Sequence, residues 1–285
     1  MEDVRSPVVA GTFYEREPDR LKAQIEWCFE HPIGPGKLPR RLNGSSRLST
    51  GYISPHAGYV YSGPVAAHAF YNLSLEKQPE TIIIIGPNHT GMGAPIALAP
   101  WREWKTPLGR IKVDLYLRDL IVKKSTIIMP DYEAHSYEHS IEVQLPFIQY
   151  LYGDTVKILP IVAMDQSLES AQRVAEELIE ILDESGRDAI VIASTDFNHY
   201  EPHDITVKKD EQAIQAILSL EPGRFFQTII RENISVCGPF AVMVLMFMHR
   251  KRNGKPPVVL KHATSGDTGG DKTYTVGYVS AVFPL

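Results

Sequence analysis

Three short apolar runs, each followed at once by a turn that carries a histidine, constrain this chain most strongly. The runs and the side chains that follow them are Gly51–Ser54 with His56, Thr81–Ile85 with His89, and Ala189–Ala193 with Asp196 and His199. Short β-branched runs bounded by glycine and proline are typical of strands buried on both faces, as in a parallel sheet covered by helices. Because ligands of such sheets bind beyond the carboxyl ends of the strands, neighbouring strands would bring these side chains to one site.

The order of the predicted elements indicates one α/β domain over residues 1–285. Helices are expected over 19–30, 62–73, 114–123, 140–150, 167–183, 206–220, 222–231 and 237–250, further strands over 156–162, 258–263 and 274–283, a hairpin-like segment over 96–113, and a Gly/Pro/Ser/Arg-rich loop over 32–49. Strands and helices that alternate from end to end favour three layers, with a mostly parallel or mixed sheet flanked by helices.

Charge and hydropathy argue against several classes of partner. The net charge is −5, so the chain lacks the excess of basic residues that is typical of a nucleic-acid-binding protein. Phe240–Met248 is the longest uniformly apolar stretch and is too short to span a bilayer, and Met1–Arg5 begins acidic without an apolar core. Two cysteines make no disulfide framework. We therefore expect a cytoplasmic protein with neither nucleic-acid nor membrane partners.

His56 and His89 are the strongest candidates for metal ligands. Each follows a predicted buried strand and lies near a glycine, which lets the backbone turn tightly and a ligand approach closely. A neutral imidazole is the commonest metal ligand in proteins. The alternative, in which each histidine only bonds the local backbone, explains one such turn more easily than three. Tyr59, in the same turn as His56, is expected to contact a substrate.

Cys237 is the more informative of the two cysteines. It precedes Gly238-Pro239, which open an apolar helix, so backbone N–H groups and the helix dipole would favour its thiolate. We predict that it is a metal ligand beside the two histidines; a nucleophile and a small apolar residue in a helix cap are the alternatives. Cys28 lies on the apolar stripe of a predicted helix and is expected to pack in the core.

The third turn carries groups suited to proton transfer. Asp196 and His199 are expected to act as an acid/base pair, with metal ligation or the fixing of a histidine tautomer as alternatives, and Asn198 is a candidate substrate donor. His139 is expected near the site and in contact with substrate. His135 stands four residues before it, but the His-Glu-x-x-His order of helical zinc sites is missing, so His135 is expected on the surface in a loop.

These motifs together resemble the Memo family, which is similar in fold to the class III extradiol dioxygenases. They occur in the family's order and extend over nearly the whole chain. The matching stretches are Ser6–Tyr14, Pro55–Tyr61, Gly86–Gly91, Glu138–Phe147, Ser194–His199 and Val236–Pro239.

The resemblance implies a metal pocket of the dioxygenase kind. His56 and His89 would be its ligands, Asp196 and His199 would assist proton transfer, and Cys237 would stand where the ring-cleaving relatives have a glutamate. Because sulfur replaces a hard oxygen ligand, the preference moves toward copper or zinc. The expected cofactor is one metal ion, copper or iron first and zinc as the alternative. The resemblance also implies peptide ligands and partner proteins associated with radical-SAM enzymes.

Three functions remain open at this point, and with them whether the chain is an enzyme. The first is metal-dependent redox chemistry, dioxygenase-like, on a small substrate. The second is a non-catalytic module that binds peptides or phosphopeptides in a former enzyme pocket, where helix N-termini can hold an anion. The third is hydrolysis by a zinc-bound water.

Overall fold

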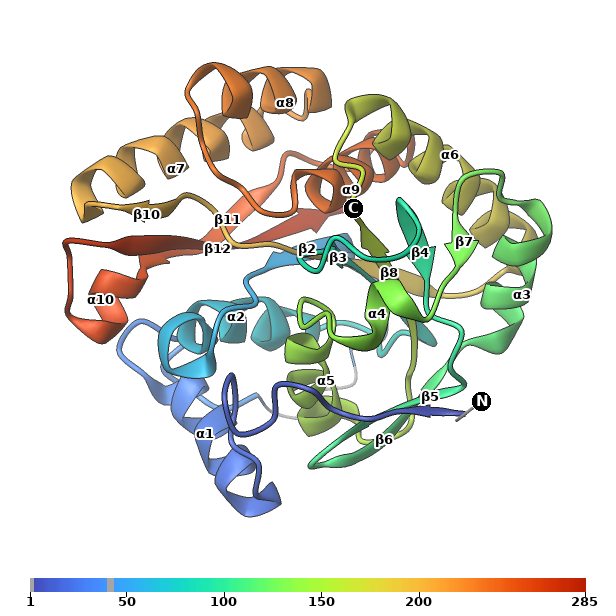
Figure 1. Cartoon of the computed structure of the whole chain (residues 1–285), viewed down its shortest axis with the longest axis horizontal. Helices are drawn as coiled ribbons and strands as arrows, with labels where there is room; N and C mark the ends of the chain where they lie inside the picture. The colour runs from blue at the N-terminus through green and yellow to red at the C-terminus, as the bar shows by residue number, and fades with distance from the viewer. Residues whose placement is uncertain (1–2, 40–43) are drawn as a thin grey trace.

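One mixed sheet of twelve strands organises the computed structural model, which describes residues 3–39 and 44–285 (Figure 1). Its main path runs β1-β5-β6-β8-β3-β9-β2-β12-β10; β11 pairs with β12, and β4 pairs with β7 and β8. The strands are β1 (Val4–Arg5), β2 (Ser49–Ser54), β3 (Thr81–Pro87), β4 (Ile96–Leu98), β5 (Glu103–Thr106), β6 (Gly109–Val113), β7 (Met129–Pro130), β8 (Lys157–Ala163), β9 (Ala189–Ser194), β10 (His199–Glu201), β11 (Val258–Thr264) and β12 (Thr275–Pro284). Positions 40–43, in the loop predicted over 32–49, lie outside the described residues, as do positions 1–2.

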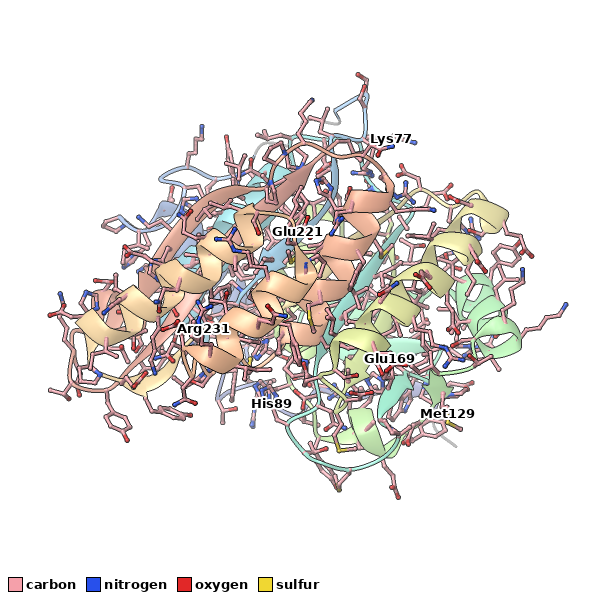
Figure 2. All side chains as sticks on the ribbon, turned by 90° about the horizontal axis from the view of Figure 1, so that it is seen from above. Lys77, His89, Met129, Glu169, Glu221 and Arg231 are labelled. Carbon is pink, nitrogen blue, oxygen red and sulfur yellow. The ribbon has the colours of Figure 1, made fainter. Side chains whose placement is uncertain are left out.

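The three strands that precede the histidine turns are neighbours at the centre of the sheet. β3 pairs with β9 in parallel over Thr81–Ile85, and β9 pairs in parallel with β2 up to Ser54 opposite Ser194. All three carboxyl ends therefore reach the same edge, as predicted. Figure 2 shows this direction, because Lys77, just before β3, and His89, just after it, lie on opposite sides of the molecule.

Helices cover both faces of the sheet. In Figure 1, α6 to α9 lie on one side of it and α1, α2 and α5 on the other. The helices are α1 (Pro18–Glu30), α2 (Tyr59–Leu73), α3 (Leu115–Lys124), α4 (Glu133–Ser136), α5 (Leu145–Tyr152), α6 (Leu168–Ser185), α7 (His203–Leu218), α8 (Pro222–Arg231), α9 (Pro239–Lys251) and α10 (Ser265–Gly269), with a 3-10 turn at Glu142–Gln144. In the described part of the chain, none is long and apolar enough to cross a bilayer.

The alternation of side chains along β3 divides the core into two layers. Ile83 and Ile85 pack with residues of α6 and α9, whereas Ile82 and Ile84 pack with residues of α1 and α2. Successive side chains of a strand point to opposite faces, so an unbroken isoleucine run requires apolar cover on both sides. Cys28 is buried in the second layer, as predicted. The three-layer α/β class with a mixed sheet is confirmed.

Several predicted boundaries are wrong where local signals compete with tertiary contacts. α2 begins at Tyr59, not at Ser62, because the Gly58 carbonyl oxygen already accepts from the Ser62 amide, and the Ser62 hydroxyl donates to the Ala57 carbonyl oxygen. Pro64 consequently lies within the helix. The helix predicted over 140–150 begins as a 3-10 turn and continues as α5, and the loop predicted around His135 contains α4.

Because Gly51 has no side chain, β2 can pair closely with β9 beneath α9. A Cβ atom at this position would overlap the Val191 carbonyl oxygen and lie 2.9 Å from Leu245 Cδ1. We expect Gly51→Ala to lower the free energy of unfolding by about 1–3 kcal/mol, the usual cost of overpacking. Urea unfolding followed by circular dichroism measures it. Gly223→Ala is the control, since a Cβ there makes only an ordinary contact with Leu168; equal losses in both variants would contradict this account.

Candidate functional site

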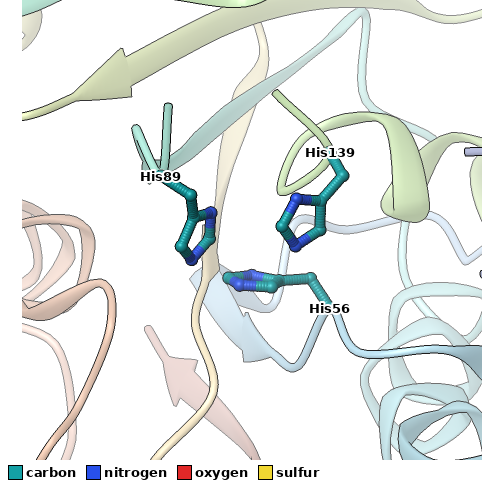
Figure 3. A group of neighbouring side chains, drawn as sticks. All are labelled: His56, His89 and His139. Atoms are coloured by element: carbon teal, nitrogen blue, oxygen red, sulfur yellow. The ribbon is translucent and has the colours of Figure 1, made fainter. Parts of the chain in front are cut away.

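Three imidazoles from separate segments converge beyond the carboxyl ends of the central strands (Figure 3). His56 follows β2, His89 follows β3, and His139 lies between α4 and the 3-10 turn. One ring nitrogen from each lies within 4.8 Å of the others. The rings of His89 and His139 are stacked with centroids 4.6 Å apart, and the His56 ring stands edge-on to both.

Hydrogen bonds settle the tautomer of His56. Its Nδ1 lies 2.9 Å from the hydroxyl oxygen of Ser194, whose own proton is donated to the Ser140 carbonyl oxygen at 2.6 Å. Ser194 also accepts from the Gln144 amide at 2.8 Å. Nδ1 of His56 must therefore be the donor, which leaves a lone pair on Nε2. Burial, followed by the neighbouring imidazoles, holds the pKa of His56 well below its ordinary value, so the ring stays neutral.

Glu138 orients the His89 ring and holds the backbone that carries His139. One of its oxygens accepts from Nδ1–H of His89 at 2.9 Å and from the amides of His139 and Ser140, each at 2.8 Å. Burial alone would raise the pKa of Glu138, but the bond to His89 and the nearby imidazoles lower it to about 2. Burial also acts to lower the pKa of His89, yet the bond and charge of Glu138 raise it above its usual value. A carboxylate behind a histidine is the usual support of a metal ligand.

Cys237 lies beside the three imidazoles. Its sulfur is 3.4 Å from Nε2 of His56 and accepts from the Asp196 amide at 3.2 Å. Contrary to the expectation that the α9 N-terminus favours the thiolate, burial and the Asp196 carboxylate raise the pKa of the thiol. Cys237 also precedes Gly238, the N-cap of α9, so it stands outside the first helical turn.

Asp196 and His199 line the same cavity, and a different backbone hydrogen bond holds each of them there. Asp196 accepts from the His56 amide at 2.8 Å, and burial raises its pKa to about 6, although His199 and that amide act in the opposite direction. Nδ1–H of His199 donates to the Ser235 carbonyl oxygen at 2.7 Å, which makes Nε2 the acceptor in the neutral form of the ring. A carboxyl that titrates near neutrality beside an imidazole is suited to holding and passing a proton.

The structure does not bring two of the predicted substrate contacts to the cavity. Asn198 is buried and its side-chain amide donates to Glu201 at 2.6 Å, so it shapes the turn. Tyr59 is buried and its hydroxyl donates to the Val143 carbonyl oxygen at 2.7 Å. The surface position expected for His135 is also wrong: it is buried in α4 and its Nε2–H donates to Ala97 at 3.1 Å.

The N-terminal segment supports the site through a buried ion pair that the sequence did not reveal. Arg5 donates to Glu142 at 2.7 Å and to the carbonyl oxygen of Glu138 at 2.6 Å, and its guanidinium lies over the Trp104 ring. Glu142 also accepts from the amides of residues 8 and 9 and from the Tyr14 hydroxyl. The only sign in the sequence was the resemblance over Ser6–Tyr14, which carried no assigned role.

The candidate site surrounds one cavity of about 900 Å³. His56, His89 and Cys237, the three predicted ligands, share it with His139, Asp196 and His199; the remaining lining residues are Phe13, Ala57, Gly58, Tyr61, Tyr200, Ser235, Ser265, Gly269, Asp271, Tyr274, Val276 and Tyr278. The ring of Phe13 packs against His139 with centroids 4.7 Å apart. The cavity is therefore polar where the imidazoles meet, and five of the other twelve lining residues are aromatic.

The chain is similar to known proteins along nearly its whole length. A family profile described as Memo-like protein matches residues 5–282. The chain is 48% identical over 282 residues to a MEMO1 family protein of Ignicoccus hospitalis, with 99% of each chain covered. It is 50% identical over 282 residues to a MEMO1 family protein of Sulfurisphaera tokodaii, covering 98% of this chain and 99% of the relative.

A solved structure shares the fold at low sequence identity. An uncharacterized protein of Escherichia coli K12 superposes with a TM-score of 0.54 and 12% identity, covering 83% of this chain and 100% of the other.

Removing the charge of Glu138 should shift the titration of its partner. We expect Glu138→Gln to lower the pKa of His89, because burial is then opposed only by the weaker effect of the Asp196 carboxylate. Histidine-resolved NMR titration of the metal-free protein measures the change. Glu133→Gln, at an exposed position of α4, is the control. A His89 pKa that is unchanged in Glu138→Gln would contradict the proposed support.

Asp196 should make folding less favourable as the pH rises. Its folded-state pKa of about 6 exceeds the ordinary 3.8, so the folded state binds the extra proton between these values and wild-type stability falls across that window. We expect metal-free Asp196→Asn to resist urea at least as well as wild type at about pH 7.5, with the difference vanishing toward about pH 4. A loss of stability that is the same at every pH would contradict this sign.

Proposed function

Because this chain belongs to the Memo family, we propose that it is a metal-dependent redox protein that acts on a small substrate in its cavity. His56, His89 and His139 would hold one transition metal ion, copper or iron, and the sulfur of Cys237 would compete with His139 for the third position. The observation that carries the proposal is the convergence of three ring nitrogens within 4.8 Å.

The residues present fit such an ion. Imidazole nitrogens bind copper, iron and zinc, and a neighbouring sulfur shifts the preference toward copper or zinc. His56 and His89 each have Nδ1 bonded to a fixed partner, Ser194 and Glu138, and this is how proteins orient metal-binding imidazoles. When bound, the ion would supply electron transfer or polarise a substrate oxygen.

The chain's own groups would manage the protons of the reaction. Asp196, whose pKa is about 6, exchanges a proton near neutral pH, and His199 presents its Nε2 to the same cavity. Both groups are held by backbone partners, the His56 amide and the Ser235 carbonyl oxygen. Phe13 packs against the His139 ring within this lining.

The alternative of a phosphopeptide-binding module is less well supported. Among the described residues that line the cavity there is neither lysine nor arginine, so a phosphate would find no guanidinium or ammonium partner. The neutral His56 ring would not supply that charge either.

Metal loading of variants tests the proposal. Metal-free protein is titrated with Cu(I), Fe(II) and Zn(II), and bound metal is measured by mass spectrometry after gel filtration. We expect one equivalent in wild type and loss of binding in His89→Ala, because a ring nitrogen of the cluster is removed. His31→Ala is the control, since His31 caps α1 away from the cluster. Full loading of His89→Ala would contradict the proposed site.

The same preparations identify the third ligand and the class of chemistry. Cobalt(II) bound through sulfur shows a thiolate charge-transfer band, so its retention in His139→Ala and loss in Cys237→Ser would assign Cys237. Absence of this charge-transfer band in the wild-type protein would identify His139 as the third ligand. Reversible oxidation of the copper- or iron-loaded protein is the expected result; binding of zinc alone, with a hydrolysable ester as the substrate consumed, would favour the hydrolase.

A further inference from the structure

Tyrosines form the outer part of the cavity wall. Tyr200, Tyr274 and Tyr61 are 63%, 67% and 46% exposed, and all three line the cavity. The rings of Tyr200 and Tyr274 are stacked, with centroids 5.9 Å apart and planes 22° apart. Tyr61 stands against Gly269 of α10, where a Cβ would lie 3.0 Å from its ring. We name these three residues the tyrosine rim.

The backbone at Tyr200 adopts an unfavourable conformation that does not improve the packing of the fold. Tyr200 has φ = 61°, the left-handed region that a bulky side chain rarely adopts. It lies where the register between β10 and β12 shifts between His199 and Glu201. A bulge of this kind changes the direction in which a side chain points, and strained backbone conformations of this kind are found mainly at binding sites. Because the re-aimed ring is mostly exposed, the distortion gains little apolar burial and serves the rim.

The carboxylates of the cavity lining include one beside the rim. Asp271 lines the cavity and is exposed, and the hydroxyl and amide of Thr273 donate to one of its oxygens at 2.6 and 2.8 Å. These bonds hold its pKa below the ordinary value, so the carboxyl is ionised at neutral pH. Asp196 is a second carboxyl in the lining, and lysine and arginine are missing from the described lining residues. Tyrosine faces beside carboxylates recognise cations.

We propose that the tyrosine rim and Asp271 form a subsite for an organic cation, an ammonium group at one end of an elongated ligand. The cavity of about 900 Å³ is far larger than a small cation requires, so the rest of the ligand extends inward toward the imidazoles. The subsite adds a substrate class to the proposed function. It rests on that function only for the chemistry at the end of the ligand that lies beside the imidazoles.

A pair of probes of the same shape tests the charge. Choline and its uncharged isostere 3,3-dimethylbutan-1-ol are titrated into metal-free protein by calorimetry. We expect choline to bind at least about tenfold more tightly, and Tyr200→Leu and Tyr274→Leu to weaken choline by about 3- to 30-fold, the range of a cation–π contact. Tyr274→Phe keeps the ring face and should keep choline binding. Asp271→Asn should weaken choline and leave the isostere unchanged.

Tyr116→Leu is the control, because Tyr116 is half-exposed on α3 and lines a different hollow. Equal affinity for choline and the isostere, or equal loss in Tyr116→Leu, would overturn the proposal. So would loss of choline binding in Tyr274→Phe with its unfolding temperature unchanged. Metal loading of the same variants separates the two proposals: selective choline binding without metal binding leaves only the subsite, and metal binding without choline selectivity leaves only the redox function.

Discussion

Parallel pairing of β3, β9 and β2 is the constraint on which the rest of the structure depends. Once Thr81–Ile85 is hydrogen-bonded in register with β9, and β9 with β2, the chain must leave all three strands at one edge. Both faces of these strands are buried, so helices occupy them and polar side chains gather in the loops beyond the carboxyl ends. His56, His89 and Asp196 share a cavity for this reason.

Burial of charge explains why segments far from the strands belong to the site. A buried carboxylate or guanidinium is tolerated only with partners. Glu138 satisfies this through His89 and the backbone amides of its own turn, while Arg5 satisfies it through Glu142, two carbonyl oxygens and the Trp104 ring. The N-terminal segment thereby holds the turn that carries His139.

The magnitudes of competing effects decide the state of Cys237. A helix N-terminus stabilises a nearby anion by about 0.3–1 kcal/mol, and one unit of pKa corresponds to about 1.36 kcal/mol. Burial beside the Asp196 carboxylate raises the pKa of the thiol by more than that pull can offset. The same low polarity keeps His56 neutral and brings Asp196 to a pKa near neutrality. One environment therefore raises the pKa of the sulfur and of the carboxyl and lowers that of the imidazole.

The sequence by itself determined the local features: the buried strands, the turns that bring His56 and His89 to one edge, and the three-layer class, because apolar periodicity and turn residues act between near neighbours. His139 was expected near the site as a substrate contact, but only the tertiary structure decided that its ring joins these two imidazoles, that His135 is buried and that Asn198 faces the turn. Those outcomes depend on contacts such as Glu138 with His89, 49 residues apart, and Arg5 with Glu142, 137 residues apart. A local pattern cannot encode them, since each exists only after the sheet and its covering helices have closed around the charges.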